Sequence, residues 1–139
     1  MNQGLYYLAL PYHGTEEQKA FRTELSLTAA AEFLRQGIHV FAPIIYVNQI
    51  AKSMQFSTQD QRRGVIMPYL LDFLKVSKGM VLVTTEGWKD SWGVRQELKF
   101  CQTHQIPVYK ISPEQIEGNI PDFPGIILNS IQIEELISA

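Results

Sequence analysis

The feature that most constrains the fold is the alternation of short apolar runs with longer segments that carry helix signals. The apolar runs lie near residues 5–10, 38–45, 80–84 and 107–111. Helical segments between successive strands are typical of parallel pairing through crossover connections. The sequence therefore predicts a three-layer α/β fold, a mostly parallel flavodoxin/Rossmann-like sheet with helices on both faces. A length of 139 residues fits one domain over residues 1–139.

The first helix is the best defined. Thr15 and Gln18 have the spacing of a capping box, in which each side chain accepts a hydrogen bond from the other residue's backbone amide. Gly37 suits the position just after the last helical turn. The apolar residues between them recur at helical spacing and predict one buried stripe: Phe21, Leu25, Ala29 and Phe33.

The middle and the end of the chain are less regular. Residues 48–66 are polar and hard to assign. Ser57-Thr58-Gln59-Asp60 is a candidate cap of a short helix, and Gly64 and Pro68 weaken any continuous one. Pro68 instead suits the first position of a new helix that leads into the third strand. The tail is rich in proline, so we expect mostly irregular backbone there, with a short strand near residues 125–128 and a terminal helix from about Ser130.

Composition excludes several classes of function. The formal net charge is −2 and the sequence pI is about 5.9, which argues against binding to a nucleic-acid polymer. The apolar run from Leu5 to Pro11 lacks the basic region of a secretory signal, and no run approaches the roughly 20 residues of a membrane span. Cys101 is the single cysteine and the histidines lack ligand spacing, so no metal or other cofactor is expected. The expected location is cytoplasmic.

Residues 91–104 contain the most informative pattern. A helix there buries a stripe of Val94, Leu98 and Cys101, and at about 100° per residue Glu97 lies on the shoulder of that stripe. Gly93 lies one turn before it, and because side chains lean toward the helix N-terminus, the glycine leaves a hollow beside the carboxylate. Such a hollow suits a flat ligand or a sugar. The other interpretation is a tolerated first-turn glycine and a glutamate that pairs with Arg95 or with a neighbour of Lys99.

Further candidates surround this pair. Asp90 is either a simple N-cap or a catalytic carboxylate, and Asp72 is either an exposed helix position or a buried acid that needs a partner. Ser91 is the other possible N-cap and a candidate for substrate binding. No glycine-rich phosphate loop is present. A phosphate group would instead meet Lys89, Ser91 and Arg95 near the helix N-terminus.

Two tryptophans and one loop complete the candidate site. Trp88 and Trp92 flank the motif and are either packing residues or platforms on which a flat ring of a ligand stacks. Pro11 and Tyr12 follow the first strand. Parallel sheets bind ligands at the carboxyl ends of their strands, so both are substrate-binding candidates.

Three segments stand out beyond these local patterns, and they cover roughly residues 5–112. They are YYLALPY, PYLLDFLKVSKGMVLV and EGWKDSWGVRQELKF. Together they resemble the nucleoside 2-deoxyribosyltransferase family. The third segment, with its GW(K/R)DS-x-G-(I/V)-R-x-E pattern, is similar to a bacterial branch of that superfamily known as a domain of unknown function.

The resemblance implies cleavage or transfer at the N-glycosidic bond of a small-molecule nucleoside or nucleotide. It implies that Glu97, four residues after Gly93, is the nucleophile and is ionised near neutral pH. Tyr7 would position it, and Asp72 would contact the substrate. The carboxylate would capture the cationic C1′ as a glycosyl ester, while Asp90 or Asp72, kept protonated by burial, would protonate the departing base.

The chain departs from the family pattern at two positions. Ser91 stands six residues before Glu97, where the family usually has an aspartate, and Met80 opens the third strand, where an aspartate is common. The fold expectation does not depend on these side chains, whereas the substrate expectation does.

Two other classes of protein stay open. One is a non-catalytic nucleotide-binding or nucleoside-binding module on the same fold, and the other is a protein whose apolar surface serves assembly only. Members of the resembling family complete their pockets with a neighbouring subunit. We therefore expect a homo-oligomer with Tyr12, His13 or residues 46–60 near a subunit boundary.

Overall fold

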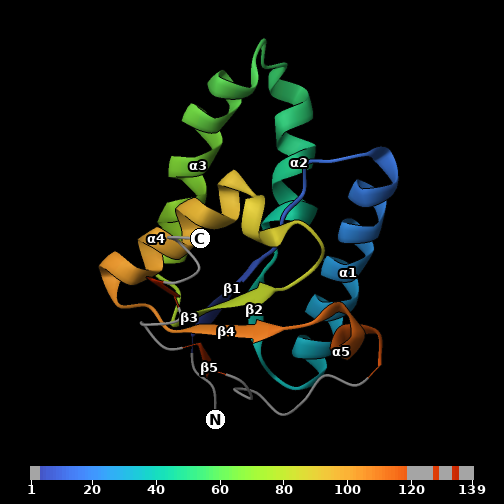
Figure 1. The fold of residues 1–139 in the computed structure, drawn as a ribbon, viewed down its shortest axis with the longest axis vertical. Coiled ribbons are helices and arrows are strands. Elements are labelled where there is room, and N and C mark those ends of the chain that lie inside the picture. The colour runs from blue at the N-terminus through green and yellow to red at the C-terminus, as the bar shows by residue number, and fades with distance from the viewer. Residues whose placement is uncertain (1–3, 119–126, 129–132, 135–139) are drawn as a thin grey trace.

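The structure is a computed structural model that describes residues 4–118, 127–128 and 133–134. Its strands form one sheet in the order β2-β1-β3-β4-β5 (Figure 1). Pairing is parallel from β2 through β4, and β5 joins β4 in antiparallel orientation. The mostly parallel sheet expected from the sequence is confirmed. The strands are β1 (Leu5–Ala9), β2 (His39–Phe41), β3 (Gly79–Val83), β4 (Val108–Ile111) and β5 (Ile127–Leu128).

Helices cover both faces of this sheet, as expected for three layers (Figure 1). α3 and α4 pack on one face, and α1 packs with α5 on the other. None of the helices in the described ranges is long and apolar enough to cross a membrane. The helices are α1 (Glu16–Arg35), α2 (Pro43–Met54), α3 (Gln59–Lys75), the 3₁₀ turn η1 (Trp88–Asp90), α4 (Trp92–His104) and α5 (Pro113–Glu117).

The central strands supply both cores because successive side chains of a strand point to opposite faces. On β1, Tyr7 and Ala9 join the core under α3 and α4, whereas Tyr6 and Leu8 join the core under α1. Every residue of β3 is buried. A parallel strand buried on both faces shows a continuous apolar run in the sequence rather than an alternating one.

The strand expected near residues 38–45, interrupted or ended near Pro43, is shorter than predicted. β2 ends at Phe41, and α2 begins at Pro43. Proline at the first helical position has no amide hydrogen to leave unpaired, and its fixed φ suits a helix. The apolar run is thus divided between a short strand and the buried face of a helix, which includes Ile44 and Val47.

The expected helix start at Pro68 is wrong. α3 is continuous from Gln59 to Lys75, with Thr58 as its N-cap and both Gly64 and Pro68 inside it. Proline cannot donate to the carbonyl four residues earlier, which here belongs to Gly64. Both residues are exposed, and a Cβ on Gly64 would meet nothing within 4 Å, so water can reach this carbonyl. α2 and α3 form a hairpin that extends beyond the sheet (Figure 1).

α1 confirms its capping box and corrects its apolar stripe. Thr15 and Gln18 make both hydrogen bonds of the box. Phe21, however, is 46% exposed, while the next residue, Arg22, is 4% exposed. The stripe therefore begins at Leu25, and a buried arginine occupies the first turns of the helix.

The tail contains one element that the sequence did not predict, the short helix α5, which Ser112 caps through a second capping box. The expected strand near residues 125–128 is present as β5. The terminal helix expected from about Ser130 falls mostly outside the described residues. Of that segment, Ile133 and Glu134 are helical, and Ile133 is buried in the core under α3 and α4.

Candidate active site

A cavity of about 440 Å³ lies at the carboxyl ends of the strands. Its walls come from the end of β1 and the loop after it, the first turns of α2, the inner face of α3 and the first half of α4. The chain runs from β1 to one neighbour, β2, and then crosses back to the other, β3. Open α/β sheets bind ligands in the crevice at such a reversal. The volume falls in the range of about 300–1,000 Å³ of small-molecule sites.

The structure brings Glu97 and Tyr7 together in this cavity. Glu97 lines the cavity although its side chain is only 6% exposed. Tyr7, fully buried on β1, donates its hydroxyl hydrogen to Glu97 Oε2 at 2.5 Å. In the described part of the chain, this hydroxyl is the hydrogen-bond partner of the carboxylate, so Oε1 is left for a ligand. Val94, Leu98 and Cys101 form the buried stripe beside it, as expected.

Burial sets the protonation of this pair. Loss of hydration raises the pKa of Glu97 from 4.5 to about 7, and the hydrogen bond from Tyr7 lowers it by a smaller amount. Burial also raises the pKa of Tyr7 well above 10, and the charge of Glu97 adds to that rise. Glu97 was expected to be ionised near neutral pH, but with a pKa of about 7 the carboxylate is about half ionised there.

Gly93 lines the same cavity, one turn before Glu97. A Cβ built on it would lie 3.7 Å from Met67 Cε and 3.9 Å from Ser91 Oγ, which are ordinary van der Waals distances. A methyl group therefore fits, whereas a longer side chain would extend into the cavity. Ser91 lines the cavity and also caps α4, because its hydroxyl accepts a hydrogen bond from the Val94 amide at 3.3 Å.

The two predicted acids differ in their positions. Asp90 lines the cavity at the mouth of α4, but its side chain is exposed. Asp72 is exposed on α3 and does not line the cavity, so the structure does not bring it to Glu97. The burial that was expected to keep one of them protonated is therefore absent at both positions.

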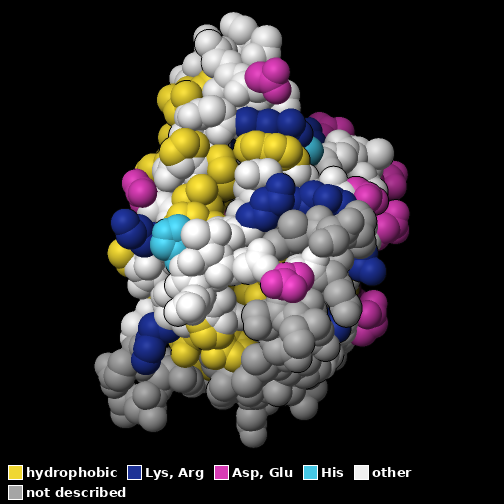
Figure 2. Space-filling model, turned by 60° about the vertical axis from the view of Figure 1, so that its left-hand side comes forward, with side chains coloured by type: hydrophobic (Ala, Val, Ile, Leu, Met, Phe, Trp, Pro, Cys, Tyr) yellow, Lys and Arg dark blue, Asp and Glu magenta, His cyan; other side chains and the backbone are white. Residues whose placement is uncertain are grey.

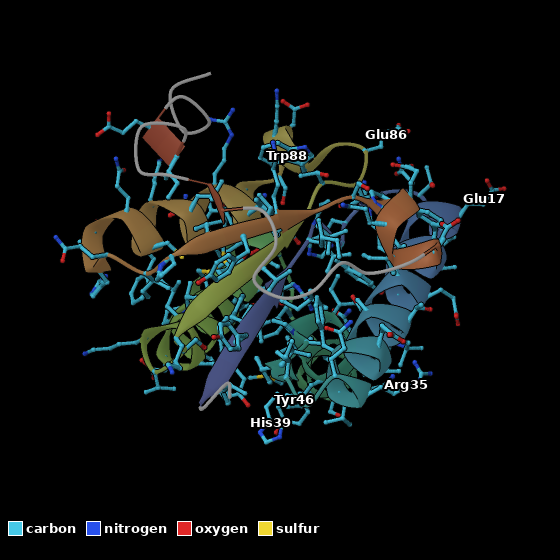
Figure 3. The ribbon with its side chains drawn as sticks, turned by 90° about the horizontal axis from the view of Figure 1, so that it is seen from below. Glu17, Arg35, His39, Tyr46, Glu86 and Trp88 are labelled. Carbon is cyan, nitrogen blue, oxygen red and sulfur yellow. The ribbon has the colours of Figure 1, made fainter. Side chains whose placement is uncertain are left out.

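Most of the aromatic and loop candidates line the cavity, but one of them does not. Pro11, Tyr12 and Trp92 line the cavity. Trp88 does not: it packs partly buried against the core, with Lys89 Nζ 5.6 Å from its ring, and Figure 3 shows it on the turn before α4. Trp92 stacks on the Arg63 guanidinium, whose carbon lies 4.5 Å from the ring centroid. One face of Trp92 is thus already covered.

Sequence reasoning missed the basic side chains of the cavity, which are Arg22, Arg62 and Arg63. Lys89 and Arg95, the phosphate candidates from the sequence, do not line it. The adjacent arginines at 62 and 63 fall in the stretch that the sequence left unassigned. To place Arg62 and Arg63 in the cavity, one must know that this stretch is helical and that α3 packs beside α4.

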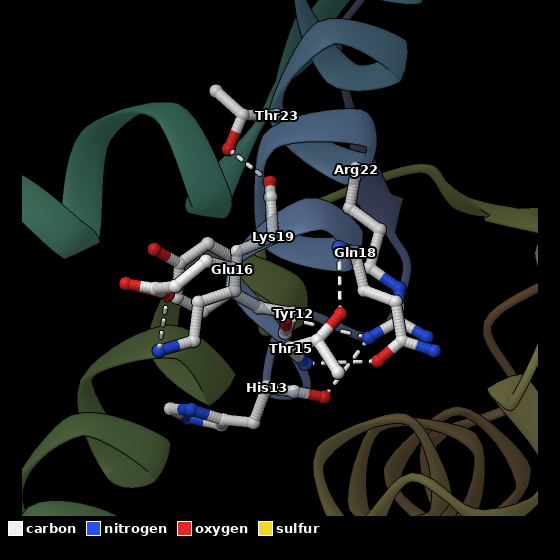
Figure 4. Close-up of polar contacts among 8 residues, drawn as sticks. All are labelled: Tyr12, His13, Thr15, Glu16, Gln18, Lys19, Arg22 and Thr23. Atoms are coloured by element: carbon white, nitrogen blue, oxygen red, sulfur yellow. Dashed lines mark hydrogen bonds and ion pairs between the residues drawn. The ribbon is translucent and has the colours of Figure 1, made fainter.

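Arg22 holds together the two loops that frame the cavity, and Figure 4 shows its contacts with the first of them. Its Nη1 donates to the carbonyl oxygens of Tyr12 and His13 at 3.4 and 2.9 Å, and its Nη2 donates to the carbonyl oxygen of Glu86 at 2.7 Å. These carbonyls belong to the loop after β1 and the loop after β3. Arg22 therefore fixes both loops from the buried side of α1.

Replacing Arg22 with methionine is expected to lower the free energy of unfolding by roughly 2–4 kcal/mol, because three backbone carbonyls of the two loops lose their charged donor. Urea denaturation followed by circular dichroism measures this change. Arg35→Met is the matched control, since Arg35 lies on the same helix, is exposed and, among the residues that the structure describes, pairs with Glu32. It is expected to cost less than about 1 kcal/mol. Equal losses in both variants would contradict the assigned role of Arg22.

The fold places the chain in a class that also contains a solved enzyme. The structure of 2-deoxyribosyltransferase from the psychrotolerant bacterium Bacillus psychrosaccharolyticus, a biocatalyst for nucleoside synthesis, matches with a TM-score of 0.55. The match covers 92% of this chain and 79% of that chain at 22% identity. This likeness shows a shared three-layer, flavodoxin-like fold.

Residues 4–113 match the family described as "Domain of unknown function (DUF1937)". The match spans well over half of the chain, and the protein belongs to this family. No match was found among curated proteins.

Proposed function

We propose that this protein cleaves or transfers at the N-glycosidic bond of a nucleoside or nucleotide, with Glu97 as the nucleophile. The observation that carries the proposal is a buried carboxylate that faces a ligand-sized cavity while Tyr7 holds one of its oxygens. The shared fold with a nucleoside-synthesising 2-deoxyribosyltransferase supports the substrate class.

In the first step, Glu97 Oε1 bonds to C1′ of the sugar while the bond from C1′ to the base nitrogen breaks. The bonding electron pair leaves with the base, which takes up one proton. C1′ is cationic in the transition state, and a carboxylate with little hydration stabilises that charge more strongly than water does. Tyr7 keeps the carboxylate in one orientation, so the attacking oxygen is already aligned.

The second step releases the sugar from Glu97. A second base attacking C1′ gives transfer, and water gives hydrolysis, with configuration at C1′ retained in either case. Asp90 is the carboxyl group of the cavity lining besides Glu97, and it is the proposed donor of the proton to the leaving base. Its side chain is exposed, so it is proposed to relay a proton from solvent water rather than to hold one in advance.

The proposal is tested by incubating the protein with nucleosides and their 5′-monophosphates, with and without an acceptor base, and separating the released bases by chromatography. Release that depends on Glu97 is the expected result. Binding of one of these compounds without any turnover would favour a non-catalytic binding module on the same fold.

We also propose that the protein is a homo-oligomer with the α2–α3 hairpin at a subunit boundary. Large apolar side chains are exposed on both helices, and Figure 2 shows hydrophobic side chains along one side of the protruding hairpin. Tyr46 on α2 is 49% exposed and Val65 on α3 is 45% exposed, and Val76, the C-cap of α3, is 70% exposed. Contiguous exposed apolar surface commonly marks an interface.

Light scattering at tens of micromolar is expected to give a mass above that of one 15.9 kDa chain. Val65→Glu should shift that mass toward the monomer, because a charge in an apolar interface loses its hydration. Thr28→Glu, at an exposed position on α1, is the control and should leave the mass unchanged. A monomeric wild-type protein would refute this proposal.

A further inference from the structure

The lining of the cavity is polarised. Three arginines, Arg22, Arg62 and Arg63, face two carboxylates, Asp90 and Glu97. Glu97 lies beside the sheet, where it accepts a hydrogen bond from Tyr7 of β1. Arg62 and Arg63 lie in the first turns of α3, toward the end of the α2–α3 hairpin that is away from the sheet (Figure 1). The outer part of the cavity is therefore positive, and the acid that would react lies deeper.

Two contacts hold the outer arginines in place. Arg62 Nη2 donates to Asn48 Oδ1 at 3.1 Å, and Asn48 Nδ2 donates in turn to the carbonyl oxygen of Ile44 at 2.8 Å. The Arg63 guanidinium stacks on Trp92. Both side chains are thus ordered by neutral groups from α2 and α4. Ordering in advance of binding reduces the entropy that a ligand must overcome.

Neither outer arginine has an acidic partner within the residues that the structure describes. The salt bridges found there are Lys19–Glu16 and Arg35–Glu32, both on the surface of α1. Arg63 Nε is buried without a hydrogen-bond partner in the same part of the chain. Partial burial lowers the pKa of Arg62. Desolvated cations that lack a counter-charge destabilise a fold, and a bound anion removes that cost.

The other basic groups nearby have different roles. The guanidinium of Arg22 already donates to three carbonyl oxygens. Its main contribution to the cavity is therefore its positive charge rather than hydrogen-bond donors for a ligand. His13 lines the cavity, and its pKa is lowered, first by lost hydration and then by the charges of Arg62, Lys19 and Arg63. A neutral imidazole at that position can still donate one hydrogen bond to a ligand.

We propose that Arg62 and Arg63 bind the phosphate of the substrate, so that the protein acts on nucleoside 5′-phosphates in preference to free nucleosides. This inference rests on the proposed function for the nucleoside part, and on the arginine pair for the anion. Guanidinium groups match the oxygens of a phosphate in pairs of parallel hydrogen bonds. With C1′ at Glu97, the 5′-phosphate reaches toward the outer, positive part of the cavity.

The experiment measures binding and turnover separately. Isothermal titration gives Kd for common nucleosides, their 5′-monophosphates, their 3′-monophosphates and inorganic phosphate, and chromatography gives kcat/KM where turnover occurs. The proteins are the wild type, Arg62→Gln, Arg63→Gln and the double variant with lysine at both positions. Arg35→Gln loses the same charge from the far end of α1 and is the control (Figure 3).

The wild type should bind a 5′-monophosphate at least about tenfold more tightly than its nucleoside. Each glutamine variant should weaken that binding by about ten- to a hundredfold while changing nucleoside binding by less than about threefold. The double lysine variant keeps the charge but not the paired hydrogen-bond geometry. Its affinity for the 5′-monophosphate should therefore lie between that of the wild type and that of the glutamine variants. Arg35→Gln should match the wild type.

The two proposals fail in different ways. The phosphate site is overturned if 5′-monophosphates and nucleosides bind equally, if 3′-monophosphates are preferred, or if Arg35→Gln weakens binding as much as the cavity variants do. Turnover of free nucleosides that ignores Arg62 and Arg63 would leave the glycosidic function standing without the phosphate site. Arginine-dependent binding without turnover would leave the phosphate site standing and the glycosidic function refuted.

Discussion

Replacing Glu97 with glutamine is expected to lower kcat by about three orders of magnitude or more, equivalent to roughly 4 kcal/mol in the activation barrier. Glutamine keeps the shape of the side chain and still accepts the hydrogen bond from Tyr7. It removes the negative charge and the nucleophile that the cationic C1′ requires. Initial rates with the best substrate of the panel measure the loss.

The same substitution should make the folded protein more stable at neutral and alkaline pH. Because the pKa of Glu97 is raised from 4.5 to about 7, the folded state binds more protons than the unfolded chain between these values. Stability is therefore lost as pH rises through that window, by up to about 3 kcal/mol. Glutamine does not ionise, so Glu97→Gln should gain up to that amount near pH 8 and little near pH 4.

Glu24, exposed on α1, offers the matched control, and Glu24→Gln should change neither rate nor stability appreciably. The pH dependence of kcat/KM gives a second check. Activity should rise through a pKa near 7 as Glu97 ionises, and Tyr7→Phe should move that limb to higher pH because the hydrogen bond from Tyr7 lowers the pKa. Full activity in Glu97→Gln would show that another group reacts with the sugar.

Gly93→Leu is expected to abolish substrate binding, whereas Gly93→Ala should keep most of it. A methyl group at residue 93 meets its nearest neighbours at 3.7 Å or more, but the remaining atoms of a leucine would extend into the cavity beside Glu97. Leucine and alanine both favour a helix over glycine by about 1 kcal/mol, so neither variant should unfold. Isothermal titration measures binding, and thermal unfolding checks the fold.

The comparison of the two variants separates steric exclusion from a backbone effect. A backbone that needs glycine would be disturbed by alanine and leucine alike. Loss of binding in both variants would therefore contradict the claim that Gly93 leaves space for the ligand. Tight binding by Gly93→Leu would contradict the same claim.

The layers and the parallel sheet could be predicted because their signals are local. The runs that became β1 and β3 are short, apolar and bounded by turn residues, and the capping box at Thr15 fixed the start of α1. The errors arose where tertiary packing, rather than the local sequence, determines the secondary structure. The apolar run around Pro43 suits a strand or a buried helix equally, and Pro68 inside α3 has the same local preferences as a proline that opens a helix.

The candidate site, too, could be predicted where its residues are close in sequence, and not where tertiary packing brings them together. Glu97, Gly93 and Ser91 lie on one helix, so their spacing alone placed them on one side of it. Tyr7 is ninety residues away in sequence from Glu97, and only the resemblance paired the two before the structure did. Arg22 lies on a helix whose apolar stripe was predicted, but its sequence does not distinguish a buried arginine from a solvated one. Arg63 lies in the stretch through which the sequence predicted no continuous helix. Asp72 is exposed, which is one of the two interpretations that the sequence left open.

The central claim is that Glu97 forms a covalent bond to C1′, and peptide mass spectrometry tests it most directly. The protein is incubated with a 2′-fluoro analogue of its best nucleoside or 5′-monophosphate substrate, without acceptor base, and then quenched in acid. Fluorine beside C1′ destabilises the cationic transition state and slows release of the sugar. The account predicts a glycosyl mass on the peptide that contains Glu97, and none in Glu97→Gln. A glycosyl group on another residue, or an unmodified Glu97 in protein that the analogue has inactivated, would contradict it.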